Sequence, residues 1–288
     1  MTARRSVPAP SPWRQRLRRL ADELPVHLFL FLPNASVIFI GYYLVANTLK
    51  PTIEFYRSEF APPSTISFDA LVRAVESGGM LLALRNSIIL AGVSTAIALF
   101  FGACAAYAFS RLRLPWKQIL FVGMLVPMSI SPMVVTIPLF AQMAELGLIN
   151  TFTGGIMIYV GLRISFVIYV LEGAFRDLPD EIFEASRMDG ASNVGTFFWI
   201  LLPMAAPSLA AVGLFCVLET WNDLLIGLLF LSRPEVIPIT ANVVTFQQKF
   251  SADPQIIFAG LFMAALPLLV VYTFAQRFFI KGLSGAFK

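Results

Sequence analysis

Long stretches without a charged side chain decide what this chain can fold into. Four of them exceed the roughly 20 apolar residues that a helix needs to cross a bilayer; they are 26–49, 86–110, 118–144 and 254–276. Two further stretches are long enough but carry charges: Arg163 lies in the middle of 151–173, and Glu219 and Asp223 lie in 203–231. The sequence therefore predicts an all-α protein with six transmembrane helices.

The composition excludes several other classes of protein. Hydrophobic residues make up 58% of the chain and charged residues only 13%, about half the charged share of soluble domains. Cys104, Cys216 and the single His27 offer neither a disulfide framework nor a metal cluster. The net charge of +4 is better explained by orientation in a membrane than by nucleic-acid binding.

The basic residues predict which side of the membrane each end faces. Six spans place both termini on one side, and 14 Lys and Arg fall on that side against six on the other. Both termini are therefore expected to be cytoplasmic. We expect a basic cytoplasmic tail at 1–24, a six-span transmembrane domain at 25–281 and a cytoplasmic tail at 282–288.

The third span is expected to be kinked or interrupted, because it contains Pro127, Pro132 and Pro138. Carbonyls freed at membrane depth are tolerated beside protein or water rather than lipid. The alternative is an ordinary proline-kinked span with no part in transport.

The segment 175–202, which contains "EASRMDGASNVGTFFWILL", is not needed to cross a bilayer. Asp177 is a plausible N-cap, Gly190 a plausible residue just past a helix end, and Ser192 a cap for a second helix. The pattern predicts a helix–Gly–helix projecting into the cytoplasm between two spans. The alternative is an amphipathic helix lying on the lipid headgroups.

Several motifs in this order resemble one family. "EASRMDGA" followed by "ILLP" resembles the coupling-loop signature of ATP-binding-cassette importer permeases, with Ser186 in place of the usual second Ala. "NSIILAGVSTAIALFFGACAAYAFSRLRLPWK", "ELGLINT", "WND" and "QRFFIKGLSGAFK" are similar to the carbohydrate-uptake branch. The resemblance covers most of the chain and points to the smaller, six-span permease of the maltose and glycerol-phosphate type.

The resemblance implies partners and docking residues. It implies that Glu184, Ala185, Asp189 and Gly190 dock on an ATPase subunit, with Ser192 and Pro203 shaping the loop. It further implies two ATPase subunits, a second homologous permease and an extracytoplasmic substrate-binding protein. No G-x-x-x-x-G-K-[ST] motif is present, so no cofactor is expected in this chain, and ATP and Mg²⁺ are expected in the ATPase partners. Lys281–Lys288 is expected to contact either the ATPase or the headgroups of membrane lipid.

Charged and polar residues inside the predicted spans are candidates for the translocation path, because such residues are costly in lipid. Arg163 is one candidate. Glu219, Asn222 and Asp223 are spaced to share one face of a helix. The alternative is that Glu219 or Asp223 pairs with Arg163, or with the partner permease, to make packing specific.

The expected function is that of a permease subunit in an ATP-driven importer of a sugar, polyol or oligosaccharide, working by alternating access in a bacterial or archaeal cell (inner) membrane. The chain itself is expected not to be an enzyme. An ion-gradient-driven secondary transporter is the alternative, since Glu219 and Asp223 are acidic residues able to carry protons.

Overall fold

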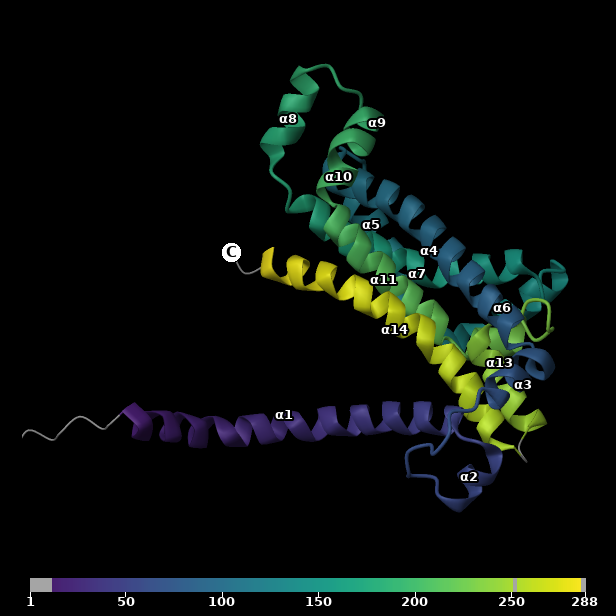
Figure 1. Ribbon diagram of the computed structural model, residues 1–288. Coiled ribbons are helices and arrows are strands. Elements are labelled where there is room, and N and C mark those ends of the chain that lie inside the picture. Colours follow the sequence, from purple (N-terminus) through teal and green to yellow (C-terminus); the bar gives the residue numbers. More distant parts are fainter. Residues whose placement is uncertain (1–11, 251–252, 286–288) are drawn as a thin grey trace, which may run out of the picture. The chain divides into compact units, whose positions relative to one another are not determined.

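The computed structural model describes residues 12–250 and 253–285, which are largely helical and contain no strand (Figure 1). The chain divides into two compact units, residues 1–68 and 69–288. Side chains are described between Phe29 and Thr273. The predicted basic tail 1–24 and the predicted contacts of Lys281–Lys288 therefore fall outside the described side chains.

The first unit consists of a long helix and a short folded excursion. The helix α1 (Pro12–Leu49) begins well before the uncharged stretch at 26–49, and α2 (Thr52–Arg57) follows it directly. The excursion returns to the end of α1, where the Ser67 N–H donates to the Leu49 carbonyl at 2.8 Å.

Lys50 holds this excursion together, although it resembles an ordinary external basic residue in the sequence. Its side chain is almost fully buried. The ammonium donates to Asn47 Oδ1 at 3.1 Å and to the carbonyls of Ser58 and Glu59, both at 2.9 Å. Burial lowers the pKa of Lys50 from its usual value, against the opposing charges of Glu54 and Glu59.

The second unit contains the remaining helices. In chain order they are α3 (Asp69–Gly78), α4 (Met80–Arg111), α5 (Lys117–Leu125), the 3₁₀ turn η1 (Val126–Ser129), α6 (Pro132–Glu145), α7 (Phe152–Arg176), α8 (Asp180–Met188), α9 (Asn193–Thr196), the π-helical turn η2 (Phe197–Leu201), α10 (Leu202–Met204), α11 (Ala206–Asn222), α12 (Leu225–Phe230), α13 (Ile239–Lys249) and α14 (Pro254–Gly285). Within this unit α8 and α9 project at one end, and α3 and α13 lie toward the other (Figure 1).

Three helical segments among the described residues are long and apolar enough to cross a membrane: α4, α7 and residues 254–273 of α14. Two bent pairs raise the number to five if each is one span; residues 117–129 and 132–145 meet at 95°, and 193–204 and 206–222 meet at 77°. The all-helical architecture is thus confirmed. The count of six spans and the cytoplasmic termini remain predictions.

The predicted interruption of the third span is confirmed. Pro127 lies in η1 and Pro132 is the first residue of α6. Ser131, directly before Pro132, is extended (φ −61°, ψ 132°), as expected because the proline ring disfavours the helical conformation of the preceding residue. Pro138 lies inside α6 without ending it.

One of the buried clusters of the second unit forms where α4, α7 and α11 pack together, with small side chains on α4. Ala98, Ala103 and Ala106 of α4 belong to one buried cluster with Val167 of α7. A Cβ atom on Gly102 would lie 2.5 Å from Cγ1 of Val167. Small residues let membrane helices approach closely, so α4 and α7 form a tightly packed pair.

Candidate functional site

The loop between α7 and α11 has the predicted helix–Gly–helix form. Gly190 follows α8 with a positive φ of 78°, a conformation open to glycine and costly for other residues. Its N–H donates to the Arg187 carbonyl at 3.1 Å, and the Ala191 N–H donates to the Ser186 carbonyl at 3.0 Å. This pair of bonds is a Schellman motif, which confirms the predicted role of Gly190 in ending α8.

The second helix of the loop begins as predicted. The Ser192 hydroxyl accepts the Gly195 N–H at 3.1 Å and so caps α9. The chain then passes through η2 and α10 to α11. Pro203 lies in α10, directly before the 77° bend that separates residues 193–204 from α11.

The predicted start of the first helix was wrong by two residues. Asp177 is the C-cap of α7, and its N–H donates to the Gly173 carbonyl at 3.1 Å. Asp177 is still close to helical (φ −73°, ψ −10°), because α7 continues to Arg176. The N-cap position of α8 is held by Pro179, which makes no side-chain cap.

The four predicted docking residues lie on the open surface of the loop. Glu184, Ala185, Asp189 and Gly190 are all exposed. Met188 beside them is 89% exposed, an apolar side chain that the sequence analysis did not single out although it lies inside the quoted motif. Together these residues offer a partner two carboxylates, a tight turn and one large apolar side chain.

Ser186 and Thr196 join the two helices of the loop from the inside. Both side chains are buried, and their hydroxyl oxygens are 3.1 Å apart. The Ser186 hydroxyl also lies 3.1 Å from the Phe183 carbonyl, to which it donates. Ser186, which resembles a simple small-for-small replacement in the sequence, therefore provides a polar link that alanine could not.

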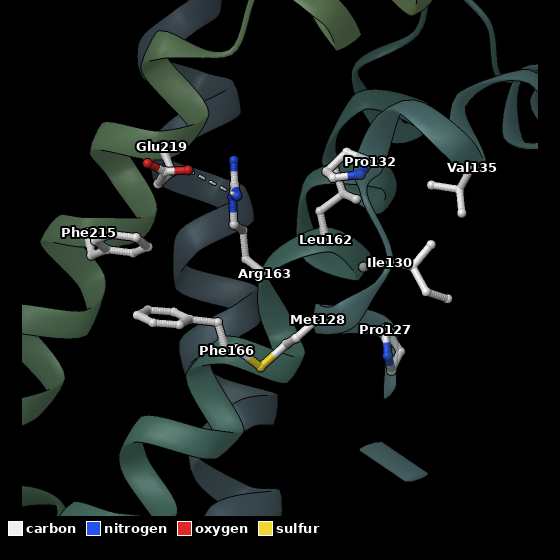
Figure 2. A pocket seen from close by; sticks show the side chains of 11 residues that line it. Pro127, Met128, Ile130, Pro132, Val135, Leu162, Arg163, Phe166, Phe215 and Glu219 are labelled. Atoms are coloured by element: carbon white, nitrogen blue, oxygen red, sulfur yellow. Dashed lines mark ion pairs between the residues drawn. The ribbon is translucent and has the colours of Figure 1, made fainter. Parts of the chain in front are cut away.

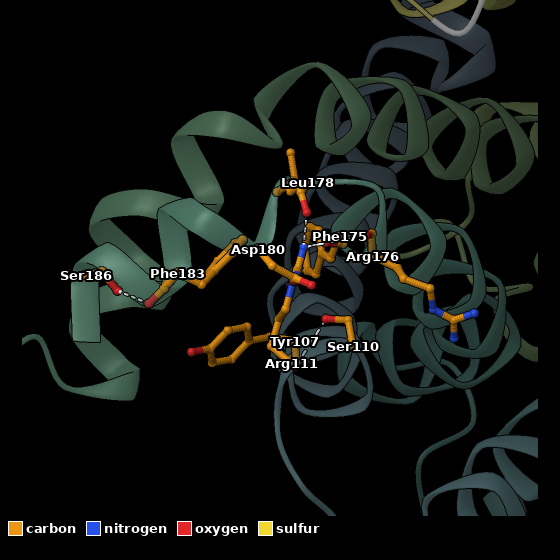
Figure 3. Close-up of polar contacts among 9 residues, drawn as sticks. All are labelled: Tyr107, Ser110, Arg111, Phe175, Arg176, Leu178, Asp180, Phe183 and Ser186. Atoms are coloured by element: carbon orange, nitrogen blue, oxygen red, sulfur yellow. Dashed lines mark hydrogen bonds and ion pairs between the residues drawn. The ribbon is translucent and has the colours of Figure 1, made fainter. Parts of the chain in front are cut away.

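Arg111, the last residue of α4, reaches across to the start of this loop (Figure 3). Its Nη2 donates to the carbonyls of Phe175 and Leu178, each at 2.5 Å, and its Nη1 pairs with Asp180. The guanidinium carbon lies 4.1 Å from the centre of the Phe183 ring. The sequence analysis used Arg111 only as one of the basic residues that set orientation.

A second region lies at the predicted mid-membrane charges. Figure 2 shows the side chains of Arg163 (α7) and Glu219 (α11) pointing toward each other beside a pocket, and Nη1 of Arg163 lies 3.3 Å from Oε2 of Glu219. Pairing of Glu219 or Asp223 with Arg163 was one alternative expected from the sequence, and this ion pair is confirmed for Glu219.

This pocket has a volume of about 290 Å³ and combines polar and aromatic groups. Phe166 and Phe215 line it with their ring centres 4.5 Å apart, and Met128 and Pro132 of the interrupted span line another side. The break in the third span therefore borders a cavity, as the prolines predict.

Asp223 does not continue the helical face of Glu219, contrary to the prediction, whereas Asn222 lies three residues after Glu219 within α11. The helix α11 ends at Asn222, and Asp223 is extended (ψ 120°). The Asp223 carboxylate accepts the Ile226 N–H at 2.8 Å and caps the start of α12. Asn222 instead lines a separate cavity of about 440 Å³ with Trp221, whose indole N–H donates to the Ala264 carbonyl at 3.3 Å.

Comparison with known proteins decides the family. Residues 79–285 match the family model described as "Binding-protein-dependent transport system inner membrane component". The chain belongs to this family. It is accordingly a membrane protein and an importer permease of the ATP-binding-cassette type, as the motifs predicted.

Individual relatives of the chain are also transport permeases. The chain is 33% identical over 264 residues to the trehalose transport system permease protein SugB of Mycobacterium tuberculosis (strain CDC 1551 / Oshkosh), covering 88% of this chain and 95% of that protein. It is 29% identical over 256 residues to the melibiose/raffinose/stachyose import permease protein MelC of Bacillus subtilis (strain 168), covering 88% and 93%. A permease chain from the crystal structure of a bacterial ABC transporter that imports the acidic polysaccharide alginate has the same fold. The TM-score is 0.79 at 21% identity, over 95% of this chain and all of that one.

Proposed function

We propose that this importer permease carries a sugar, or a related polyol or oligosaccharide, and relays the motion of an ATPase through the α8–α9 loop. The sugar class is supported by the names of its relatives, which transport trehalose or melibiose, raffinose and stachyose. The observation that carries the relay is the exposed face of Glu184, Asp189 and Gly190 on a loop anchored to a membrane helix at each end.

The partners follow from the same proposal. Two ATPase subunits bind ATP and Mg²⁺, and each permease docks on one of them through its loop; in this chain Glu184 offers a carboxylate to a basic group. A second homologous permease completes the path, and an extracytoplasmic binding protein delivers the substrate. A related fold occurs in the alginate transporter solved in complex with a periplasmic protein bound to an alginate pentasaccharide (TM-score 0.66, 18% identity).

In this mechanism the chain performs no covalent chemistry. Closure of the ATPase dimer on ATP moves the loops, and the loops move the spans so that the cavity opens outward; hydrolysis returns it to face the cytoplasm. Six spans with both termini in the cytoplasm place the loop on the ATPase side.

The pocket beside Arg163 and Glu219 is the part of this chain best suited to contact the passing substrate. Sugar hydroxyls form hydrogen bonds with charged groups, and the apolar faces of sugar rings pack on aromatic side chains such as Phe166 and Phe215. Asn222 lies in the other cavity and Asp223 is engaged in a helix cap, so these two are less suited to this role. An ion-gradient carrier is disfavoured by the family match.

The experiment that tests the relay uses the whole importer. The chain is expressed with its neighbouring permease and ATPase, and Glu184→Gln and Gly190→Val are compared with Glu145→Gln, an exposed carboxylate at the end of α6. We expect both loop variants to lose ATPase binding or binding-protein-stimulated hydrolysis, and the control to retain both. Normal assembly and hydrolysis in both loop variants would contradict the relay.

A further inference from the structure

Arg111 connects the loop to a helix that is not adjacent to it in the chain. The loop is joined covalently to α7 and, through α9, η2 and α10, to α11. We propose that Arg111 is a positioning residue that fastens the first helix of the loop to α4, so that α8, α7 and α4 move as one body when the ATPase moves. This inference rests on the relay proposed above.

The contacts explain why an arginine is suited to this task. The last carbonyls of a helix have no partner within it. That of Phe175, in the last turn of α7, and that of Leu178, in the turn before α8, both accept from Nη2 of Arg111. A planar guanidinium presents several donors in a fixed arrangement, whereas a lysine offers one point charge. The turn from Asp177 to Pro179 therefore bends around the guanidinium, which fixes the direction in which α8 leaves α7.

An aromatic ring closes the other side of this contact. Phe183 of α8 lies against the guanidinium and is itself buried in one cluster with Tyr107 of α4, Phe175 of α7 and Phe197 of η2. The Arg111 side chain is only 9% exposed. Water thus has little access to the carbonyl bonds, which strengthens them and makes their loss costly.

The ion pair with Asp180 contributes less than these bonds. The Asp180 side chain is 81% exposed, and exposed ion pairs are weak because solvent screens them. If the ion pair alone fastened α8, removing either charge would affect coupling equally. The proposal predicts instead a large effect when the guanidinium is removed and a small effect when the Asp180 charge is removed.

The two ends of the loop are held by different contacts. At the α7 end, Arg111 and the close α4–α7 packing hold α8 in place. At the α11 end the chain passes through the π-helical turn η2 and then the 77° bend. On this proposal, displacement of the loop tip reaches α4 and α7 through Arg111, and the change in angle is taken up at the 77° bend before α11.

The first test measures coupling in the complete importer, reconstituted in lipid with its binding protein. The number of ATP molecules hydrolysed per sugar transported is compared in Arg111→Met, Arg111→Lys and Asp180→Asn. The control is Arg113→Met, which alters an exposed arginine two residues further on. We expect this ratio to rise several-fold in Arg111→Met, to rise less in Arg111→Lys, and to stay near the wild-type value in Asp180→Asn and Arg113→Met. A wild-type ratio in Arg111→Met, or an equal rise in Asp180→Asn, would overturn the proposal.

The second test leaves Arg111 in place, so it decides the matter even if Arg111→Met does not assemble. Spin labels at positions 113 and 181 report the distance between the end of α4 and α8, and labels at 181 and 206 report the distance from α8 to the start of α11. We expect the first distance to be unchanged between nucleotide-free and ATP-bound importer and the second to shift. A nucleotide-dependent shift in the 113–181 distance overturns the proposal.

The two proposals fail in different ways. A wild-type chain that recruits no ATPase contradicts the relay, and the Arg111 proposal with it. A wild-type importer that transports normally, alongside an equally well-coupled Arg111→Met variant, contradicts the Arg111 proposal alone.

Discussion

Two arginines of the second unit carry the same charge in very different surroundings. Arg111 at the start of the α8–α9 loop donates to two backbone carbonyls at 2.5 Å, pairs with Asp180 and lies against an aromatic ring. Arg163 beside the α7–α11 pocket has one ion-pair partner among the described residues, Glu219, at 3.3 Å. In each of them Nε is buried without a hydrogen-bond partner.

The two sets of contacts suit different roles. Those of Arg111 hold main-chain segments together, whereas the contact of Arg163 can be replaced by a contact with a ligand. Backbone carbonyls cannot rotate away from Arg111 without moving a helix, so its contacts hold main-chain segments together. The single partner of Arg163 is a flexible carboxylate that is 47% exposed and borders a cavity of about 290 Å³. A polar ligand can replace one side-chain contact there at little structural cost.

The largest expected effect is on stability. Arg111→Met leaves the carbonyls of Phe175 and Leu178 without their donor, and each unpaired buried group costs about 1–3 kcal/mol. We expect the free energy of unfolding to fall by about 2–4 kcal/mol, and by clearly less in Arg163→Met, measured as the shift of the denaturation midpoint in detergent. Equal shifts of the midpoint in the two variants would contradict the difference drawn between the contacts of Arg111 and those of Arg163. Arg113→Met is the control and is expected to leave the midpoint unchanged.

The next effect concerns selectivity rather than coupling. Glu219→Gln keeps the size of the side chain but removes its charge from the pocket, which weakens hydrogen bonds to sugar hydroxyls. We expect the relative transport rates of two sugars that differ at one hydroxyl to change by about tenfold, the equivalent of one charged hydrogen bond. Arg111→Met should slow both sugars alike. Unchanged selectivity in Glu219→Gln would show that the pocket is only a packing feature.

The smallest expected effect lies in the link between the two loop helices. Ser186→Ala restores the residue usual in the coupling-loop signature but leaves the Thr196 hydroxyl without its partner. We expect a loss of about 0.5–1.5 kcal/mol in the free energy of unfolding, with ATPase docking intact. The double variant Ser186→Ala/Thr196→Val should recover part of this loss, because it removes both polar groups. A double variant less stable than the single one would show that the link is not made between these two hydroxyls.

Local signals explain what the sequence could predict. Gly190 and Ser192 act on the backbone within a few residues of themselves, so a helix end and a helix cap can be recognised without knowing the fold. The same is true of Pro127 and Pro132, which interrupt the third span. The expected role of the docking residues came from the resemblance of the motifs to the family, not from these local signals.

Non-local contacts explain what the sequence could not predict. Arg111 precedes the carbonyls that it contacts by more than 60 residues, and nothing in its own neighbourhood points to them. Asp223 was misplaced for a different reason. Its carboxylate competes with the helix by accepting a nearby backbone N–H, as short polar side chains do, and this competition is invisible to a search for apolar stretches. Pairing of Glu219 with Arg163 was one of two open alternatives until their helices were placed side by side.

The long separation between Arg111 and its acceptors also has a consequence for biosynthesis. Ribosomes release the chain from the N-terminus, so α4 leaves the ribosome with its terminal arginine before the carbonyls at the end of α7 have been synthesised. The loop gains its fixed direction only once α7 has been inserted beside α4. If the loop docks on the ATPase as proposed, a nascent or prematurely terminated chain would present no correctly oriented docking surface, and only permeases in which this helix pair is complete would recruit the ATPase.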